Sequence, residues 1–295
     1  MLRPVTEDRV VSTEWVADLG GVKVGGGNPV RVMGVINVSP ESFYKGSVRT
    51  SPEEVIEEAL KQVREGADII DVGAKSTAPY LETDIPVEEE VRRAVEAVKA
   101  LAHAGIGVPI SIDTTRSEVA EAALKVGASI VNDVSGLKGD PKMASVVREY
   151  GASLIVAAKP TRDVEGADPV RAVVGALEES LRICAEADID PRKVVIDPAI
   201  GFIRPANPPW YVWDSRILAR LGELSVLKRP VLVGVSRKSF LREITGRVKA
   251  EERLSASLAA TAIAVFNGAD AVRTHDVKET VDAVRVGEYL RGFKA

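Results

Sequence analysis

The feature that most constrains the fold is a repeated alternation of short β-branched runs with longer segments of helical period. From about residue 30 the unit recurs roughly every 35 residues. Most of the short runs are apolar at consecutive positions, which is typical of parallel strands covered on both faces. The predicted strands are residues 32–38, 69–73, 110–114, 130–134, 154–158, 194–200, 231–236 and 271–275.

Each pair of predicted strands is bridged by a segment of helical spacing, and several of these segments end in Gly or Gly-Ala, which suits the end of a helix. Eight such units with no linker between them predict an α/β fold, a single (β/α)8 TIM barrel with right-handed crossovers. A doubly wound open sheet is the alternative, disfavoured because no Gly-x-Gly-x-x-Gly turn follows the first strand. Residues 1–29, rich in glycine, are predicted to form a short N-terminal hairpin or arm, and residues 30–295 the barrel.

Composition narrows the class of protein. With 45% hydrophobic residues the chain is too apolar to be disordered. Its formal charge of −4 gives no overall positive field that would attract nucleic acid or an anionic membrane, so any anion site must be a local one. The single cysteine, Cys184, cannot form an internal disulfide, and we expect a buried thiol on a helix. The N-terminus lacks the apolar core of a signal peptide, and the Ala-rich run at 256–266 is too short to span a bilayer, so a cytoplasmic protein is expected.

Polar residues gather where the predicted strands end, which is where a barrel of this type carries its chemistry. Any one Asp or Ser there could be a helix N-cap. Asp71, Asp113 and Asp197, however, precede their helices by several residues and belong to the strand tips, where a buried carboxylate needs donors facing it. Together with Asn132 they predict a pocket for a flat, donor-rich heterocycle.

Cations at the same end predict an anion, because helix N-termini also point there and disfavour positive charge. A phosphate or diphosphate bound by Lys238, Arg273, His275 and backbone amides would account for them. For a single Lys75 or Arg162, a solvated loop charge is the alternative. The cations are Lys75, Lys159, Arg162, Arg237, Lys238 and Arg273.

The two histidines do not indicate zinc. His275 lies at a predicted strand tip and His103 near the end of a predicted helix, where we expect a surface or capping residue. No Cys/His/Asp cluster has the spacing of zinc ligands. A Gly-x-Ser-x-Gly elbow is also missing from the sequence, which argues against a serine hydrolase.

Seven strand-end segments, in this order, resemble the dihydropteroate synthases and the wider family of pterin-binding barrels. The resemblance covers nearly the whole chain between residues 32 and 276. One such match is weak, whereas seven in register are specific. The segments are MGVINVSPESF (33–43), DIIDVG (68–73), SIDT (111–114), NDVSG (132–136), DPAIGF (197–202), GVSRKSF (234–240) and RTHD (273–276).

The resemblance implies a homodimeric transferase of folate or methanopterin biosynthesis. It would condense 6-hydroxymethyl-7,8-dihydropterin diphosphate with an arylamine and release diphosphate, without a protein nucleophile. Both the cationic pterin methylene and the departing polyanion would need preorganised partners, with Mg²⁺ acting as a Lewis acid on the diphosphate. Dimerisation would use the helix at 255–266. The resemblance implies that Asp113, Asn132, Asp197 and Lys238 bind the pterin, with Asp71 in the same pocket. It implies that Asn37 contacts the diphosphate and Mg²⁺, that Arg273 and His275 bind the leaving anion, and that Ser76, Thr77 and Ser236 lie near the arylamine. The implied catalytic residues are Lys238, Arg273 and His275.

Three loops depart from the family pattern. After the first strand the usual Asp-Ser-Phe-Ser-Asp-Gly-Gly is replaced by ESFYKGS at 41–47, so the second acid is lost. In the usual Glu-Ser-Thr-Arg-Pro of the second loop, Lys75 replaces the acid and Ala78 the arginine. After the fifth strand, Lys159 ends an Ala-Ala-Lys that replaces Met-His-Met. Because these changes add positive charge where the arylamine would enter, we expect either 4-aminobenzoate or a phosphorylated arylamine as the second substrate.

Two other functions share the pterin contacts. A pterin-dependent corrinoid methyltransferase would need the Asp and Asn residues but not the set Lys238, Arg273 and His275. A noncatalytic pterin-binding paralogue would bind the pterin without releasing diphosphate. The Pro- and aromatic-rich stretch at 204–213 is expected to be a lid, a subunit contact or a locally packed loop.

Overall fold

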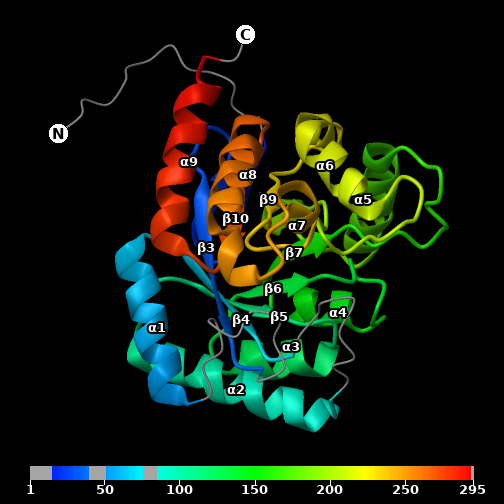
Figure 1. Cartoon of the computed structure of the whole chain (residues 1–295). Coiled ribbons are helices and arrows are strands. Elements are labelled where there is room, and N and C mark those ends of the chain that lie inside the picture. The colour runs from blue at the N-terminus through cyan, green and yellow to red at the C-terminus, as the bar shows by residue number, and fades with distance from the viewer. Residues whose placement is uncertain (1–14, 40–50, 76–84, 294–295) are drawn as a thin grey trace.

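The computed structural model describes residues 15–39, 51–75 and 85–293, and its main sheet has eight parallel strands closed into a barrel (Figure 1). A parallel bridge between Ile196 and Val231 joins the two ends of the sheet, so the predicted TIM barrel is confirmed and the open sheet is not. The strands, in their order around the barrel, are β8 (Val194–Asp197), β7 (Ser153–Ala157), β6 (Ile130–Asp133), β5 (Ile110–Asp113), β4 (Ile69–Gly73), β3 (Arg31–Asn37), β10 (Ala271–Thr274) and β9 (Leu232–Val233).

The strands lie where the sequence predicts them, but several end earlier. β8 stops at Asp197, where the predicted strand runs on to residue 200, because Pro198 has no N–H for the ladder and Ala199 adopts a positive φ of 60°. β9 has only two residues, and the chain turns after it, with Arg237 at a φ of 55°. The polar residues expected at strand ends therefore lie on turns just beyond the ladder.

Helices surround the barrel, and the glycines predicted to end them do so. Ser51 and Glu54 form a capping box at the start of α1, and Gly66 ends it at a φ of 111°. The α-helices are α1 (Pro52–Glu65), α2 (Val87–Ala104), α3 (Ser117–Lys125), α4 (Met143–Glu149), α5 (Pro169–Glu186), α6 (Trp210–Ala219), α7 (Phe240–Thr245), α8 (Leu254–Phe266) and α9 (Val277–Arg291), with 3-10 turns η2 (Pro191–Lys193), η3 (Leu221–Leu227) and η4 (Ala250–Arg253).

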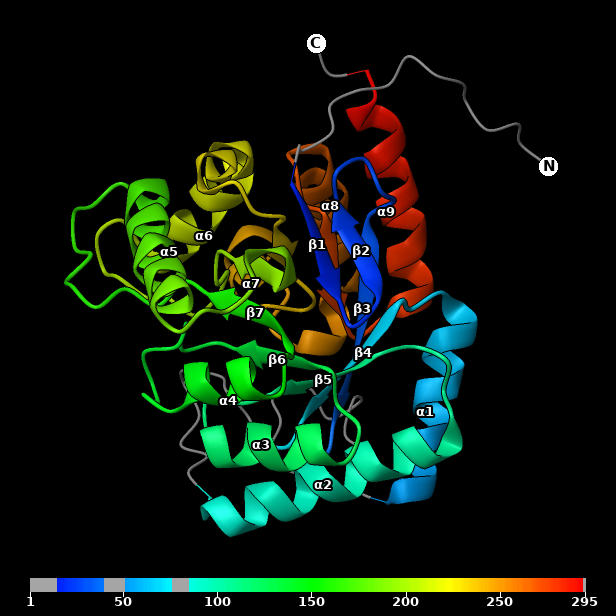
Figure 2. The same ribbon diagram turned by 180° about the vertical axis from the view of Figure 1, so that it is seen from behind.

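An antiparallel hairpin of β1 (Val16–Leu19) and β2 (Val22–Gly25) covers the amino end of the barrel, in front of the strands in Figure 2. Its Ala17, Leu19 and Val24 are buried against side chains from inside the barrel, which form one cluster there. Those barrel side chains are Met33, Ile69, Ile130, Ile155, Val195, Leu232 and Ala271. The hairpin therefore closes the end opposite the strand tips. The division into an arm and a barrel stays a prediction.

Other expectations concern single segments. Trp213 in the Pro- and aromatic-rich stretch is fully buried, and the Arg204 guanidinium lies 4.3 Å from the Trp210 ring centre, so this stretch packs locally. Cys184 is buried in α5 as predicted, and burial raises the pKa of its thiol to about 12. Across the described ranges, every helix is too short or too polar to cross a membrane.

Candidate active site

The carboxyl ends of β4, β5 and β6 bring three acidic or amide side chains together. Strand pairing sets Asn132 beside Asp113, while Asp71 is paired with Ser111, two residues deeper in the barrel. All three side chains are almost completely buried. Alternate residues of a strand point to the same face, so Ser111 and Asp113 of β5 share one face. Asp71, which is paired with Ser111, lies on that same inner face of the barrel.

Arg273, from the end of β10, binds both of these carboxylates. Its Nε donates to Asp71 Oδ2 at 2.6 Å and its Nη2 to Asp113 Oδ2 at 2.8 Å. Asn132 Nδ2 donates to the same Asp71 oxygen at 3.2 Å. The cation that we expected to need an external anion therefore has two internal ones, and the Oδ2 atom of each acid has the donor that burial requires.

Each of the two carboxylates keeps one buried oxygen with no hydrogen-bond partner among the described residues. These are Oδ1 of Asp71 and Oδ1 of Asp113. Burial raises the pKa of Asp113 to about 7, although the nearby Arg273 opposes the rise. A ligand that offers N–H donors would satisfy these oxygens and favour the charged carboxylate.

Lys238, which follows β9, lies within electrostatic reach of Asp113, Asp197 and Arg273. Its Nζ donates to the carbonyl of Ile200 and lies 4.4 Å from the Phe202 ring centre. Gly201, at a φ of 84°, leaves room for this side chain, because a Cβ there would stand 2.9 Å from the Lys238 Cδ. Burial lowers the Lys238 pKa to about 8, and Asp197 opposes the fall. This lysine is therefore poised to lose or keep its proton near neutral pH.

Asp197 itself is tied to the turn that follows β8. Its Oδ1 accepts a hydrogen bond from the Ala199 N–H at 2.7 Å. Burial raises the Asp197 pKa, while Lys238 and this backbone donor act against the rise. The acid and the lysine predicted for the pterin thus lie within electrostatic reach of each other and of Arg273.

His275 lies beside Ser236, which follows β9. The Ser236 Oγ is 3.0 Å from the His275 Nδ1 and also accepts from the His275 backbone N–H at 3.3 Å. Burial lowers the His275 pKa to about 3, and Arg273, Arg237 and Lys238 add to the effect. The imidazole is therefore neutral near pH 7, so this residue is not one of the positive charges of the site.

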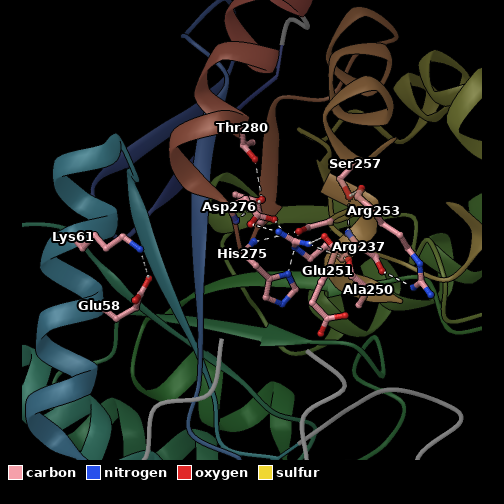
Figure 3. A network of polar contacts seen from close by, with 12 residues as sticks. Glu58, Lys61, Arg237, Ala250, Glu251, Arg253, Ser257, His275, Asp276 and Thr280 are labelled. Atoms are coloured by element: carbon pink, nitrogen blue, oxygen red, sulfur yellow. Dashed lines mark hydrogen bonds and ion pairs between the residues drawn. The ribbon is translucent and has the colours of Figure 1, made fainter. Parts of the chain in front are cut away.

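The expectation that Arg237 needs an external anion is wrong. Its guanidinium is buried and binds Asp276 in a two-pronged ion pair, Nε to Oδ2 at 2.8 Å and Nη2 to Oδ1 at 2.7 Å. Its Nη1 donates to the carbonyls of Ala250 and Glu251 (Figure 3). The charge is compensated inside the protein by the Asp276 carboxylate.

The remaining predicted site residues lie at the end of β3 or in the segments that follow β3, β4 and β7. Lys159 and Arg162 are exposed on the turn after β7, and Lys75 is half-buried after β4. The Asn37 Oδ1 lies close over Gly73, 2.9 Å from where a Cβ would stand. Ser76, Thr77 and Ala78, as well as the loop at 41–47, fall outside the described residues.

Two buried acids of this end were missed by the sequence analysis. Glu90, in the first turn of α2, accepts from Thr114 Oγ1 at 2.8 Å and from Arg116 Nη1 at 2.9 Å. Asp214 in α6 accepts from the Gly201 N–H at 2.9 Å. Helical spacing could not single them out, because charged residues on amphipathic helices are normally read as solvent-facing.

Comparisons with known proteins agree with the geometry. A sequence model described as "Pterin binding enzyme" matches residues 33–275. A dihydropteroate synthase of Mycobacterium leprae is 40% identical over 271 residues, covering 88% of this chain and 92% of that protein. A dihydropteroate synthase of Xanthomonas albilineans, solved with 4-aminobenzoic acid, has a TM-score of 0.82 and 35% identity over 95% of this chain and 99% of that one. A bifunctional folylpolyglutamate synthase/dihydropteroate synthase of Haloferax volcanii is 39% identical over 261 residues, and the match covers 86% of this chain but only 30% of that longer protein.

Proposed function

This chain belongs to the family of pterin binding enzymes, and we propose that it catalyses the dihydropteroate synthase reaction. The arylamine nitrogen attacks the methylene carbon of 6-hydroxymethyl-7,8-dihydropterin diphosphate, the carbon–oxygen bond breaks, diphosphate leaves, and the amine loses a proton. The observation that carries the proposal is the pair of buried carboxylate oxygens of Asp71 and Asp113 that have no hydrogen-bond partner among the described residues, near the cations Lys238 and Arg273.

We assign the pterin to the pocket between Asp113, Asn132, Asp197 and Lys238. A pterin ring carries several N–H donors and one carbonyl acceptor, which suits carboxylates on one side and an ammonium group on the other. Asp71 would act through Arg273 and Asn132, since its Oδ2 accepts from both. As the pterin methylene becomes cationic in the transition state, the fixed carboxylates would stabilise it more than the substrate.

The leaving diphosphate is assigned to Arg273, His275 and Asn37. Arg273 uses Nε and Nη2 for the two acids, and its Nη1 donates to no residue that the structure describes. One edge of the guanidinium thus remains for a phosphate oxygen. Catalysis by Lys238, Arg273 and His275 would consist of charge stabilisation and hydrogen bonding, with no covalent intermediate on the protein.

Magnesium fits this arrangement as an ion that enters with the diphosphate. Residues 15–39, 51–75 and 85–293 contain no cluster of three His, Cys, Asp or Glu side chains that could hold a metal. Mg²⁺ commonly uses one or two protein oxygens and takes the rest from phosphates and water. Asn37 would supply such an oxygen, and the bound ion would polarise the departing diphosphate. Calorimetric titration of diphosphate with and without Mg²⁺ tests this, with tighter binding expected when Mg²⁺ is present.

For the second substrate we propose 4-aminobenzoate. The Xanthomonas albilineans enzyme was solved with the acid form of this compound, 4-aminobenzoic acid. The site of this amine would include Thr77 and Ser236. A phosphorylated arylamine is the second candidate, because Lys159 is exposed just past β7. Steady-state kinetics with both amines decide between them, and Lys159→Ala is the matched variant, which should lower kcat/KM only for a phosphorylated amine. The first amine belongs to folate synthesis and the second to methanopterin synthesis.

The test of the proposed function is diphosphate release in a coupled phosphate assay. Release that depends on both the pterin diphosphate and an arylamine supports it. Pterin binding without release under any arylamine would favour the noncatalytic paralogue. A methyltransferase would give no protection by diphosphate in a thermal melt, because it has no need for the cation set. The homodimer through α8 and the cytoplasmic location stay predictions.

A further inference from the structure

We infer that Ser236 fixes the tautomer of His275, so that the ring keeps its proton on Nε2 and works as a neutral hydrogen-bond donor. Ser236 is thereby a positioning residue that acts through the imidazole. The inference deepens the function proposed above and rests on it only where the diphosphate is named as the acceptor. The tautomer itself follows from the contacts of the two side chains.

The hydrogen-bond count around Ser236 leaves one arrangement. Its Oγ already accepts from the His275 backbone N–H, at 3.3 Å, which can only donate. Its own hydroxyl proton needs an acceptor, since the residue is only 6% exposed. Within the described part of the chain, the remaining side-chain contact of Ser236 is the His275 Nδ1 at 3.0 Å. If the hydroxyl donates to Nδ1, that nitrogen carries no proton, and a neutral ring must carry it on Nε2.

The charges around the ring exclude a second proton. Arg273 comes from the same strand end, and Arg237 and Lys238 come from the turn after β9, and all three disfavour an imidazolium. Asp276, the acid next in the chain, has both oxygens engaged by Arg237. The ring thus faces three cations and a carboxylate that is already neutralised, and it remains neutral.

Two adjacent contacts hold Ser236 in this position. Ser236 and Arg237 follow one another after β9, and His275 and Asp276 follow one another after β10, the parallel neighbour of β9. The two pairs contact each other side by side: the Ser236 hydroxyl contacts the His275 imidazole, and the Arg237 guanidinium binds the Asp276 carboxylate. Figure 3 shows the His275 ring beside the Arg237–Asp276 ion pair. The Arg237 N–H also donates to Ser257 Oγ at 2.8 Å, which fixes the turn at a φ of 55°.

The tautomer of His275 determines whether this residue can act as a donor or as a base in the reaction. A ring with its proton on Nε2 and Nδ1 occupied cannot take the proton that the arylamine loses. It can donate from Nε2 to an oxygen of the leaving diphosphate without first acquiring a charge. His275 is therefore a donor and not a general base.

Imidazole nitrogen NMR of the unliganded protein tests the tautomer directly, because the chain has two histidines. His103 is the internal reference, since its Nδ1 lies 2.7 Å from the Lys99 carbonyl and must carry a proton there. We expect His275 to show the opposite pattern near neutral pH, a protonated Nε2 and a bare Nδ1. A proton on Nδ1, or a charged ring, would overturn the inference.

Variants of Ser236 test its part in setting the tautomer. Ser236→Ala should give a mixture of the two tautomers, whereas Ser236→Thr, which keeps the hydroxyl, should retain the native pattern. The thermal melting curve of each variant confirms that it is folded. If the Ala variant keeps a single Nε2-protonated form, Ser236 does not set the tautomer and the inference fails.

Variants of His275 test the donor, with diphosphate binding by calorimetry as the measurement. A Gln side chain places its amide N–H near the position of Nε2, and an Asn side chain places it near Nδ1. We expect His275→Gln to bind diphosphate about tenfold more tightly than His275→Asn, the difference of one hydrogen bond to a charged acceptor. Equal affinities would refute the donor role. If diphosphate release fails with every arylamine while the NMR pattern holds, only the proposed function is refuted.

Discussion

Replacing Arg273 with Met would leave two buried carboxylates without their cation. Asp71 is fully buried and Asp113 is 5% exposed, and the guanidinium binds them at 2.6 and 2.8 Å. Removing one partner of a buried ion pair costs about 3–5 kcal/mol. At roughly 2 °C per kcal/mol for a chain of this size, Tm should fall by about 6–10 °C.

The loss should grow with pH. Arg273 holds the Asp113 pKa down against burial, which has already raised it to about 7. Without the arginine this pKa rises further, so between pH 7 and the new value the folded variant holds a proton that the folded parent has released. The unfolded chains are both ionised there, and each pH unit adds about 1.4 kcal/mol to the difference. The variant should therefore be less destabilised at about pH 6 than at about pH 8.5, by up to roughly 2 kcal/mol.

Urea unfolding at the two pH values measures this difference. Arg285→Met is the matched control, because the Arg285–Asp282 pair on α9 has side chains that are 74% and 80% exposed and should matter little. Adding Asp113→Asn to Arg273→Met should restore part of the stability and remove the part of the pH dependence that comes from Asp113. A variant that is as stable as the parent at the higher pH, or whose loss is independent of pH, would refute the reasoning.

Three further predictions follow from the same structure. Leu19→Ala should destabilise the protein by about 3 kcal/mol, because this side chain is fully buried at the amino end of the barrel; unfolding measures the loss, and an altered KM for the pterin would contradict the placement. Pterin affinity should rise with pH up to about 7, as Asp113 loses its proton, and this dependence should vanish in Asp113→Asn, as calorimetry at several pH values would show. Lys238→Met should weaken pterin binding at pH 7 more than at pH 9, because the Lys238 pKa of about 8 means that the parent loses its ammonium in between; an equal loss at both would contradict it.

Much of this protein could be predicted from the order of its residues. Strand periodicity and helix-ending glycines are local properties, so the eight units and the barrel were predictable. The same holds for the strand tips, because parallel strands in a barrel deliver their carboxyl ends to one mouth. The sequence alone therefore makes Asp71, Asp113, Asn132 and Arg273 candidates, and the structure brings them into contact.

The pairing of charges was decided only by the tertiary structure. Arg237 and Arg273 looked alike in sequence, as cations at strand ends, yet Arg237 binds Asp276, the residue after His275, while Arg273 binds Asp71 and Asp113 on β4 and β5. Arg273 and Asp71 are 202 residues apart, and they meet because β10 closes the barrel beside β3. The left-handed turn at Arg237, at a φ of 55°, aims neighbouring side chains in directions that no periodic pattern encodes. Local sequence thus specified which residues reach the mouth, and long-range closure together with turn geometry determined which of them neutralise one another.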